Sequence, residues 1–121
     1  MTISTNPRSL TGAQRRILRG LGHGLKPTVQ VGRHGITDGL IQATKQALET
    51  HELIKLSVGG EAPVDRKSAP KLLAAQTGSH VAQIIGRTAL LYRRRHDDPA
   101  IRLPGVIDEA PRPDAQGGDE A

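Results

Sequence analysis

The stretch Val31-Gly32-Arg33-His34-Gly35-Ile36-Thr37 decides how the rest of the chain is organised. A β-branched run precedes it and a long helical pattern follows it, which predicts a strand, a tight Gly-x-x-Gly turn and a helix capped by Thr37. The two glycines allow a sharp turn and a close approach to a ligand. The positive end of the helix dipole, the charge of Arg33 and the imidazole of His34 suit a phosphate. We therefore interpret this loop as a clamp for a nucleic-acid backbone.

Length and composition limit the class of protein. The chain has 121 residues, room for one domain and a tail, and Tyr92 is its single aromatic residue apart from histidines. The core must therefore be aliphatic, and Tyr92 is expected to pack within a strand. No apolar run approaches the roughly 18 residues of a membrane span, and residues 1–8 lack the apolar segment of a signal peptide. There is no cysteine, so disulfides and thiolate metal sites are excluded, and we expect a cytoplasmic protein.

Charge is distributed unevenly along the chain. Before residue 105 there are 16 of the 17 Lys and Arg residues and seven of the 12 acids, so this body carries +9 and residues 105–121 carry −4. A basic body with an acidic tail is typical of a protein with a polyanion partner, although a basic solvated surface gives the same pattern.

The first helix is predicted to begin at a capping box formed by Thr11 and Gln14 and to end near Gly22 or Gly24. Its apolar stripe is expected to consist of Leu10, Ala13, Ile17 and Leu21. The opposite face carries Arg15, Arg16 and Arg19. These arginines either contact phosphates or form the charged outer face of an ordinary surface helix, and the helix pattern alone does not separate the two.

The remaining pattern predicts strands at residues 28–31, 52–58, 80–85 and 88–93, with helices at 37–50 and from Asp65 or Ser68 to Thr77. A two-residue Gly86-Arg87 turn joins the last two strands. The expected fold is a compact two-layer α/β sandwich in the order α-β-α-β-α-β-β, whose four-stranded mixed sheet contains one parallel pair. The expected domain spans residues 9–104, between a flexible N-terminus at 1–8 and a disordered acidic tail at 105–121.

Several motifs together resemble one known family. The segment Leu21-Gly22-His23-Gly24-Leu25-Lys26-Pro27, continued through the loop to Thr37, looks like the signature of the CRM domain (chloroplast RNA splicing and ribosome maturation). The later matching pieces are His51-Glu52-Leu53-Ile54-Lys55, Thr77-Gly78, Ile85-Gly86-Arg87-Thr88 and Leu91-Tyr92-Arg93. The size of the chain resembles the stand-alone bacterial, YhbY-like members.

This resemblance implies an RNA-binding domain with a fold similar to the C-terminal domain of translation initiation factor three. It also implies association with precursors of the large ribosomal subunit, and a loop comparable to that of KH domains, which clamps backbone nucleotides. The tail after residue 105 is not part of the family pattern.

Our candidate RNA contacts combine the loop with the surrounding cations. They are Gly32, Arg33, His34, Gly35, Thr37, Lys26, Arg15, Arg16, Arg19 and Arg87. The sequence does not say whether Arg87 and the run Arg93–Arg95 share one face.

Three other classes of function are alternatives to RNA binding. An enzyme would have to use His96-Asp97-Asp98 or His51-Glu52, but neither set has metal-ligand spacing, and we expect no catalysis, metal or cofactor. A membrane-surface binder would need a bulky aromatic face, which residues 11–21 lack. A protein-binding module that joins ribosomal particles without touching RNA remains an alternative. The oligomeric state is not visible in the sequence.

Overall fold

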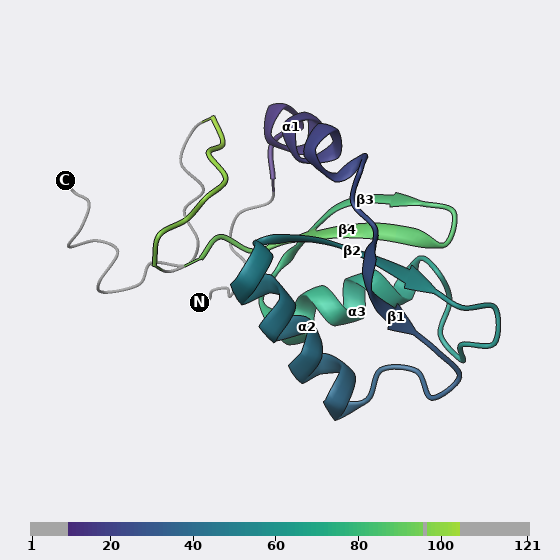
Figure 1. Cartoon of the computed structure of the whole chain (residues 1–121). Coiled ribbons are helices and arrows are strands. Elements are labelled where there is room, and N and C mark those ends of the chain that lie inside the picture. Colours follow the sequence, from purple (N-terminus) through teal and green to yellow (C-terminus); the bar gives the residue numbers. More distant parts are fainter. Residues whose placement is uncertain (1–9, 96, 105–121) are drawn as a thin grey trace, which may run out of the picture.

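The computed structural model describes residues 10–95 and 97–104, arranged as one sheet with helices on both of its faces (Figure 1). The elements follow the predicted order. They are α1 (Gly12–Gly22), β1 (Pro27–Val31), α2 (Asp38–His51), β2 (Leu53–Val58), α3 (Ser68–Thr77), β3 (His80–Ile85) and β4 (Thr88–Tyr92). Within the described segments, no helix combines the length and apolar character needed to cross a bilayer. The predictions for residues 1–8 and 105–121 lie outside the described residues.

The four strands form one mixed sheet in the order β1-β2-β4-β3. β1 and β2 are parallel, with Val31 opposite Val58, and α2 lies between them in the chain. β4 is antiparallel to both β2 and β3. At the β3–β4 turn, Gly86 has φ +58°, as the first position of a Gly-x turn requires. The predicted parallel pair, hairpin and mixed sheet are therefore confirmed.

Helices cover both faces of the sheet, which corrects the expectation of two layers. α2 and α3 pack on the face that carries Ile54, Leu56 and Leu91, whereas α1 packs on the opposite face, over Leu53 and Leu90. Figure 1 shows α1 on one side of the sheet and α2 with α3 on the other. The reason is that successive residues of a strand point to opposite faces, so the adjacent Leu53 and Ile54 each need cover.

The buried face of α1 differs from the predicted apolar stripe. Ile17 and Leu21 are 39% and 50% exposed, so they do not belong to the core. Gly22 instead contacts the sheet, because a Cβ atom at this position would lie only 2.5 Å from Leu90 Cδ1. The face of α1 that packs on the sheet is therefore set by the close approach of Gly22, not by the number of apolar side chains on that face. The buried positions of α1 are Gln14, Leu18 and Gly22.

Buried Gln14 has a partner for each of its polar atoms. Its Oε1 accepts from the Thr11 N–H at 2.9 Å, and its own N–H donates to Thr11 Oγ1 at 3.1 Å, which confirms the capping box. Its Nε2 donates to the carbonyl of Pro104 at 2.9 Å. The last described residue is therefore joined to α1.

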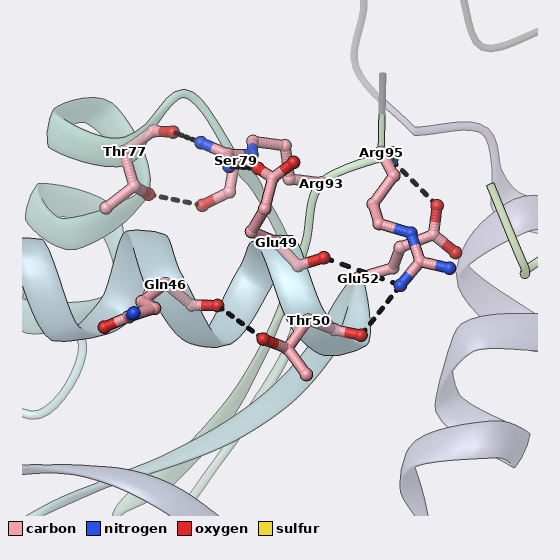
Figure 2. Close-up of polar contacts among 8 residues, drawn as sticks. All are labelled: Gln46, Glu49, Thr50, Glu52, Thr77, Ser79, Arg93 and Arg95. Atoms are coloured by element: carbon pink, nitrogen blue, oxygen red, sulfur yellow. Dashed lines mark hydrogen bonds and ion pairs between the residues drawn. The ribbon is translucent and has the colours of Figure 1, made fainter. Parts of the chain in front are cut away.

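The segment after β4 is also fixed to the end of α2. Glu52 follows α2 with φ +65°, is fully buried, and accepts hydrogen bonds of 2.8 Å from the backbone N–H groups of Arg95, Ala100 and Ile101. Figure 2 shows Arg95 beside Glu52, with its guanidinium donating to the Thr50 carbonyl at 2.8 Å. Residues 95–104 thus complete the domain rather than extend from it.

Side chains accept hydrogen bonds from backbone N–H groups at or just before the first turns of α2 and α3. Thr37 Oγ1 accepts from the Leu40 N–H at 3.1 Å, as predicted for α2. For α3, the sequence offers Asp65 or Ser68 as the cap, and Pro70 favours Ser68. The preference for Ser68 is wrong, because Ser68 is the first helical residue and the N-cap position is Lys67, which makes no side-chain cap bond. The carboxylate of Asp65, in the turn before the helix, accepts from the backbone N–H groups of Lys67 and Ser68, both at 3.2 Å.

Candidate nucleic-acid interface

The Gly-x-x-Gly loop forms a β-turn between β1 and α2. The N–H of Gly35 donates to the carbonyl of Gly32 at 2.9 Å, and the two side chains between them, Arg33 and His34, are exposed. Gly35 is buried with φ +72°, and a Cβ atom there would lie 3.1 Å from Pro63 Cγ. Only glycine fits this position without strain.

Gly32 differs from Gly35, because the fold does not require a glycine there. A Cβ atom at Gly32 would meet no described atom within 4 Å, and its φ is not in the left-handed region. The main chain at Gly32 therefore faces open space beside Arg33. A ligand can therefore occupy the space that a Cβ atom would fill at any other residue.

The start of α2 lies directly after the loop. The hydroxyl oxygen of Thr37 is engaged by the helix through its bond from the Leu40 N–H. Asp38 is the first helical residue and is exposed, so a carboxylate stands where the helix dipole is most positive. An anion at this end meets its most favourable surroundings at the Gly32–Gly35 turn rather than on the helix axis.

Two other connections meet the loop at the same end of the sheet. The N–H of Gly59, after β2, donates to the carbonyl of Val31 at 2.9 Å. Arg87, in the β3–β4 turn, donates through Nη1 to the carbonyls of Gly59 at 3.3 Å and Val58 at 3.4 Å. Arg87 therefore lies at the loop end, as a candidate contact should, although part of its guanidinium is engaged by backbone.

Arg66 is a cation at this end that the sequence did not single out. Its Nη1 donates to the carbonyl of Gly86 at 3.2 Å, next to Arg87 in the turn. No local pattern marks Arg66, because its position depends on how the loop before α3 crosses the end of β3.

The arginines of α1 are not brought together with the loop. Arg15 lies near His80, at the start of β3 and thus at the other end of the sheet. Burial of the His80 ring lowers its pKa, and the nearby charge of Arg15 lowers the pKa further. The exposed Arg16 lies next to Arg15 on α1, whereas Arg19 and Lys26 lie toward the end of α1 and the start of β1.

Arg93 and Arg95 hold the far end of α2. Arg93 Nη2 binds the Glu49 carboxylate at 2.8 Å, and its Nη1 donates to the carbonyl of Thr77 at 3.0 Å (Figure 2). Glu49 lies 11 residues after Asp38 in α2, so about 17 Å separates this contact from the loop end of the helix. Arg87 and the two arginines therefore occupy different ends of the domain.

His51 and Glu52, one of the two sets considered for catalysis, lie in different surroundings. His51 is exposed, whereas the carboxylate of Glu52 is buried and bound by three backbone N–H groups. Across residues 10–95 and 97–104, no group of three or more His, Asp or Glu side chains is placed to hold a metal ion. His96 lies outside the described residues.

Tyr92 is buried and stacks with His80 at a ring separation of 6.5 Å, which confirms its packed role.

Residues 10–93, which include the loop, both hairpin strands and all three helices, match the family model described as the CRS1 / YhbY (CRM) domain. The chain belongs to this family. The resemblance carried by the loop signature and the later motifs is thereby confirmed, and the CRM domain accounts for almost all of the described fold.

The relatives of this CRM domain include stand-alone bacterial proteins. The chain is 39% identical over 95 residues to the "Probable RNA-binding protein YqeI" of Bacillus subtilis, covering 78% of this chain and 99% of that protein. It is 37% identical over 86 residues to the "Probable RNA-binding protein PA4753" of Pseudomonas aeruginosa, covering 71% and 83%. The solution structure of the hypothetical protein SAV1595 from Staphylococcus aureus superposes with a TM-score of 0.68 at 37% identity, covering 78% and 99%.

Proposed function

We propose that this chain binds RNA through the exposed Gly32–Thr37 loop and the cations beside it, and that this RNA is ribosomal RNA in precursors of the large ribosomal subunit. The observation that carries the proposal is the exposure of Arg33 and His34 in the middle of the Gly32–Gly35 turn. The RNA-binding names of the bacterial relatives support it. The ribosomal part rests on the resemblance to the stand-alone bacterial members.

In this proposal the phosphate lies against the turn. The guanidinium of Arg33 pairs with a phosphate oxygen, and the bare main chain at Gly32 allows the sugar-phosphate backbone to approach closely. The Asp38 carboxylate repels a second phosphate from the helix axis, so the contact is centred on Arg33. Arg87 adds positive charge at the same end of the sheet.

Base stacking contributes little at this loop. The single phenol ring, Tyr92, is buried, and the chain has no Phe or Trp. Without an aromatic platform, binding depends on phosphate contacts and on backbone shape, so it weakens steeply as salt concentration rises.

The test is a titration of fluorescent single-stranded RNA with the Arg33→Ala variant at several salt concentrations. Loss of one phosphate contact reduces the slope of log K against log salt by about one unit and weakens binding at every salt concentration. Arg102→Ala is the matched control, because it removes the same charge from an exposed position near Pro104 and far from the loop in the chain. An unchanged slope for Arg33→Ala, or equal effects of both variants, contradicts a role for the loop.

A test in cells addresses the ribosomal part separately. Ultraviolet crosslinking, followed by sequencing of the attached RNA, is expected to recover ribosomal RNA of the large subunit from cytoplasmic particles. Recovery of unrelated transcripts would leave RNA binding intact and would reject the ribosomal assignment.

A second candidate function is a protein contact on ribosomal particles without direct contact with RNA. The observation that favours it is the outer face of α1, where Ile17 and Leu21 are 39% and 50% exposed. Ile17 and Leu21 are one helical turn apart, so they form one aliphatic surface that a protein partner can cover. If this candidate is right, association with particles survives RNase treatment and is lost in an Ile17→Ser/Leu21→Ser variant.

A further inference from the structure

A groove of about 550 Å³ lies between the end of α1 and the face of the sheet that α1 covers. We propose that this groove binds one nucleotide of a single-stranded RNA, as a second contact for the strand whose phosphate lies on the Gly32–Gly35 turn. This inference rests on the proposed RNA binding and adds to it a site that lies on the other face of the sheet from α2. The side chains that carry the argument are Arg19, His23, Lys55, Gln83, Ile85 and Leu90.

The groove is basic, and its cations are available. Arg19 lines it from α1, His23 lines it from the residue after α1, and Lys55 lines it from β2. Among the described residues, no hydrogen bond or ion pair engages Arg19 or Lys55, and no Asp or Glu lines the groove. In contrast, Arg93 and Arg95 donate to carbonyl or carboxylate oxygens of the domain itself. Charged donors without an internal partner suit a phosphate.

The floor of the groove suits a base. Ile85 is 60% exposed beside the buried Leu90, so an uncovered aliphatic surface lies within reach of the cations. The amide of Gln83 lines the same surface, and within residues 10–95 and 97–104 it has no hydrogen-bond partner. A flat heteroaromatic ring can cover Ile85 while its edge bonds with the amide, which offers both a donor and an acceptor.

The groove spans the sheet from β2 to β3, and its Lys55 side neighbours β1, the strand that leads to the loop. Lys55 is opposite Pro27 at the start of β1, and β1 leads directly to Val31 and the turn. The four steps from Pro27 to Val31 span about 13 Å. Thr28 and Gln30 are exposed on β1, between the turn and the Lys55 side of the groove.

A nucleotide fits the groove better than an acidic protein segment. The cations alone would accept either, but an extended acidic segment offers no flat ring to cover Ile85 and bond the Gln83 amide together. Cations and an amide that have no partner among the described residues, together with an exposed aliphatic floor, suit a phosphate joined to a base.

The experiment compares Lys55→Gln with Lys71→Gln, using a short single-stranded RNA of mixed sequence and the full chain. Lys71 is an exposed lysine of α3, on the opposite face of the sheet, so the control removes the same charge away from the groove. Lys55→Gln is expected to weaken binding by about fivefold and to lower the salt slope by about one unit. Lys71→Gln is expected to change neither by as much.

A second variant tests the base contact without changing charge. Gln83→Leu is expected to weaken binding while the salt slope stays unchanged, because no phosphate contact is lost. NMR spectra of the wild-type chain are expected to show that the RNA shifts the Ile85 methyl and Gln83 side-chain amide signals. Intact amide spectra of both variants establish that they are folded.

The outcomes separate this inference from the proposed function. If RNA shifts the signals of Gly32 and Gly35 but not those of Ile85 and Gln83, and Lys55→Gln behaves like Lys71→Gln, the groove proposal is overturned and the loop proposal stands. If polyglutamate shifts the Ile85 and Gln83 signals as strongly as RNA, the groove is a general anion site and the nucleotide assignment is overturned. If RNA produces no shifts at all, both proposals fail.

Discussion

The carboxylate of Glu52 accepts a hydrogen bond of 2.8 Å from the backbone N–H of Ile101, 49 residues further along the chain. The other backbone donors to this carboxylate are Arg95 and Ala100, also at 2.8 Å. A fully buried carboxylate held by three N–H groups is satisfied only while the segment after β4 stays in place. Glu52 thereby makes the stability of the sheet depend on a segment without regular secondary structure.

Replacing this carboxylate should therefore cost stability. In Glu52→Gln, one carboxylate oxygen becomes an NH2 group that faces backbone donors, so the free energy of unfolding is expected to fall by about 2 kcal/mol. Urea unfolding followed by circular dichroism measures the change. Glu49→Gln is the control, since the Glu49 side chain is 60% exposed and its pair with Arg93 is worth less than about 1 kcal/mol. Equal losses in the two variants would contradict the role of Glu52.

The two glycines of the loop should respond differently to alanine. Gly35→Ala places a Cβ atom 3.1 Å from Pro63 Cγ at φ +72°, and we expect a loss of about 1–2 kcal/mol of stability. Gly32→Ala meets no such obstacle, so stability should change by less than about 0.5 kcal/mol while RNA affinity falls. Thermal unfolding and RNA titration separate the effects. Normal RNA affinity in Gly32→Ala would show that the ligand does not approach that backbone.

Two glycines of α1 give a second matched pair. Gly22→Ala directs a Cβ atom to within 2.5 Å of the buried Leu90, so it should destabilise the domain by about 1–3 kcal/mol through overpacking. Gly20→Ala meets nothing within 4 Å in the same helix and should stabilise it by about 0.5–1 kcal/mol. Opposite signs in chemical denaturation would verify the way α1 packs. Stabilisation by both substitutions would mean that α1 packs less closely than the structure indicates.

His80 should make stability depend on pH. Burial, and then the charge of Arg15, lower the pKa of His80 in the folded chain. As pH falls below about 6.5, the unfolded chain therefore binds a proton before the folded chain does, and the free energy of unfolding decreases. The His80→Gln variant should lose this decrease, which urea unfolding at a series of pH values can measure. Arg15→Gln should reduce the decrease by removing the second cause. A His80→Gln profile that falls as steeply as the wild type would exclude His80 as its source.

Local signals predicted the element order, and the structure agrees. The Thr11–Gln14 capping box, the Thr37 cap and the Gly86-Arg87 turn each depend on a few neighbouring residues, so their chemistry can be read directly from the chain. The packing of α1 could not be read in this way. It depends on Leu90, far away in sequence, and on the absence of a side chain at Gly22. Hydrophobic periodicity therefore selected Ile17 and Leu21, which are exposed.

The candidate interface likewise has a part that local sequence signals predict and a part that depends on long-range packing. The loop was found from its glycines and from the helix that follows it, but the direction of the surrounding cations is a property of the whole sheet. Arg15 and Arg19 are one helical turn apart, yet Arg15 lies near His80 while Arg19 lines the groove with Lys55. Lys55 was overlooked because Ile54 and Leu56 define the core face of its strand. Lys55 lies on the other face of the strand, and its role in the groove depends on the position of α1 next to it.

The family match ends at residue 93, whereas the partners of Glu52 and Gln14 extend to Pro104. The folded domain therefore extends about ten residues beyond the end of the family match. Truncation at residue 93 removes the backbone N–H groups that bind the buried Glu52 carboxylate. It also removes the Pro104 carbonyl that accepts from the buried Gln14 amide. Boundaries for expression, crystallisation or transplantation of the module belong after residue 104.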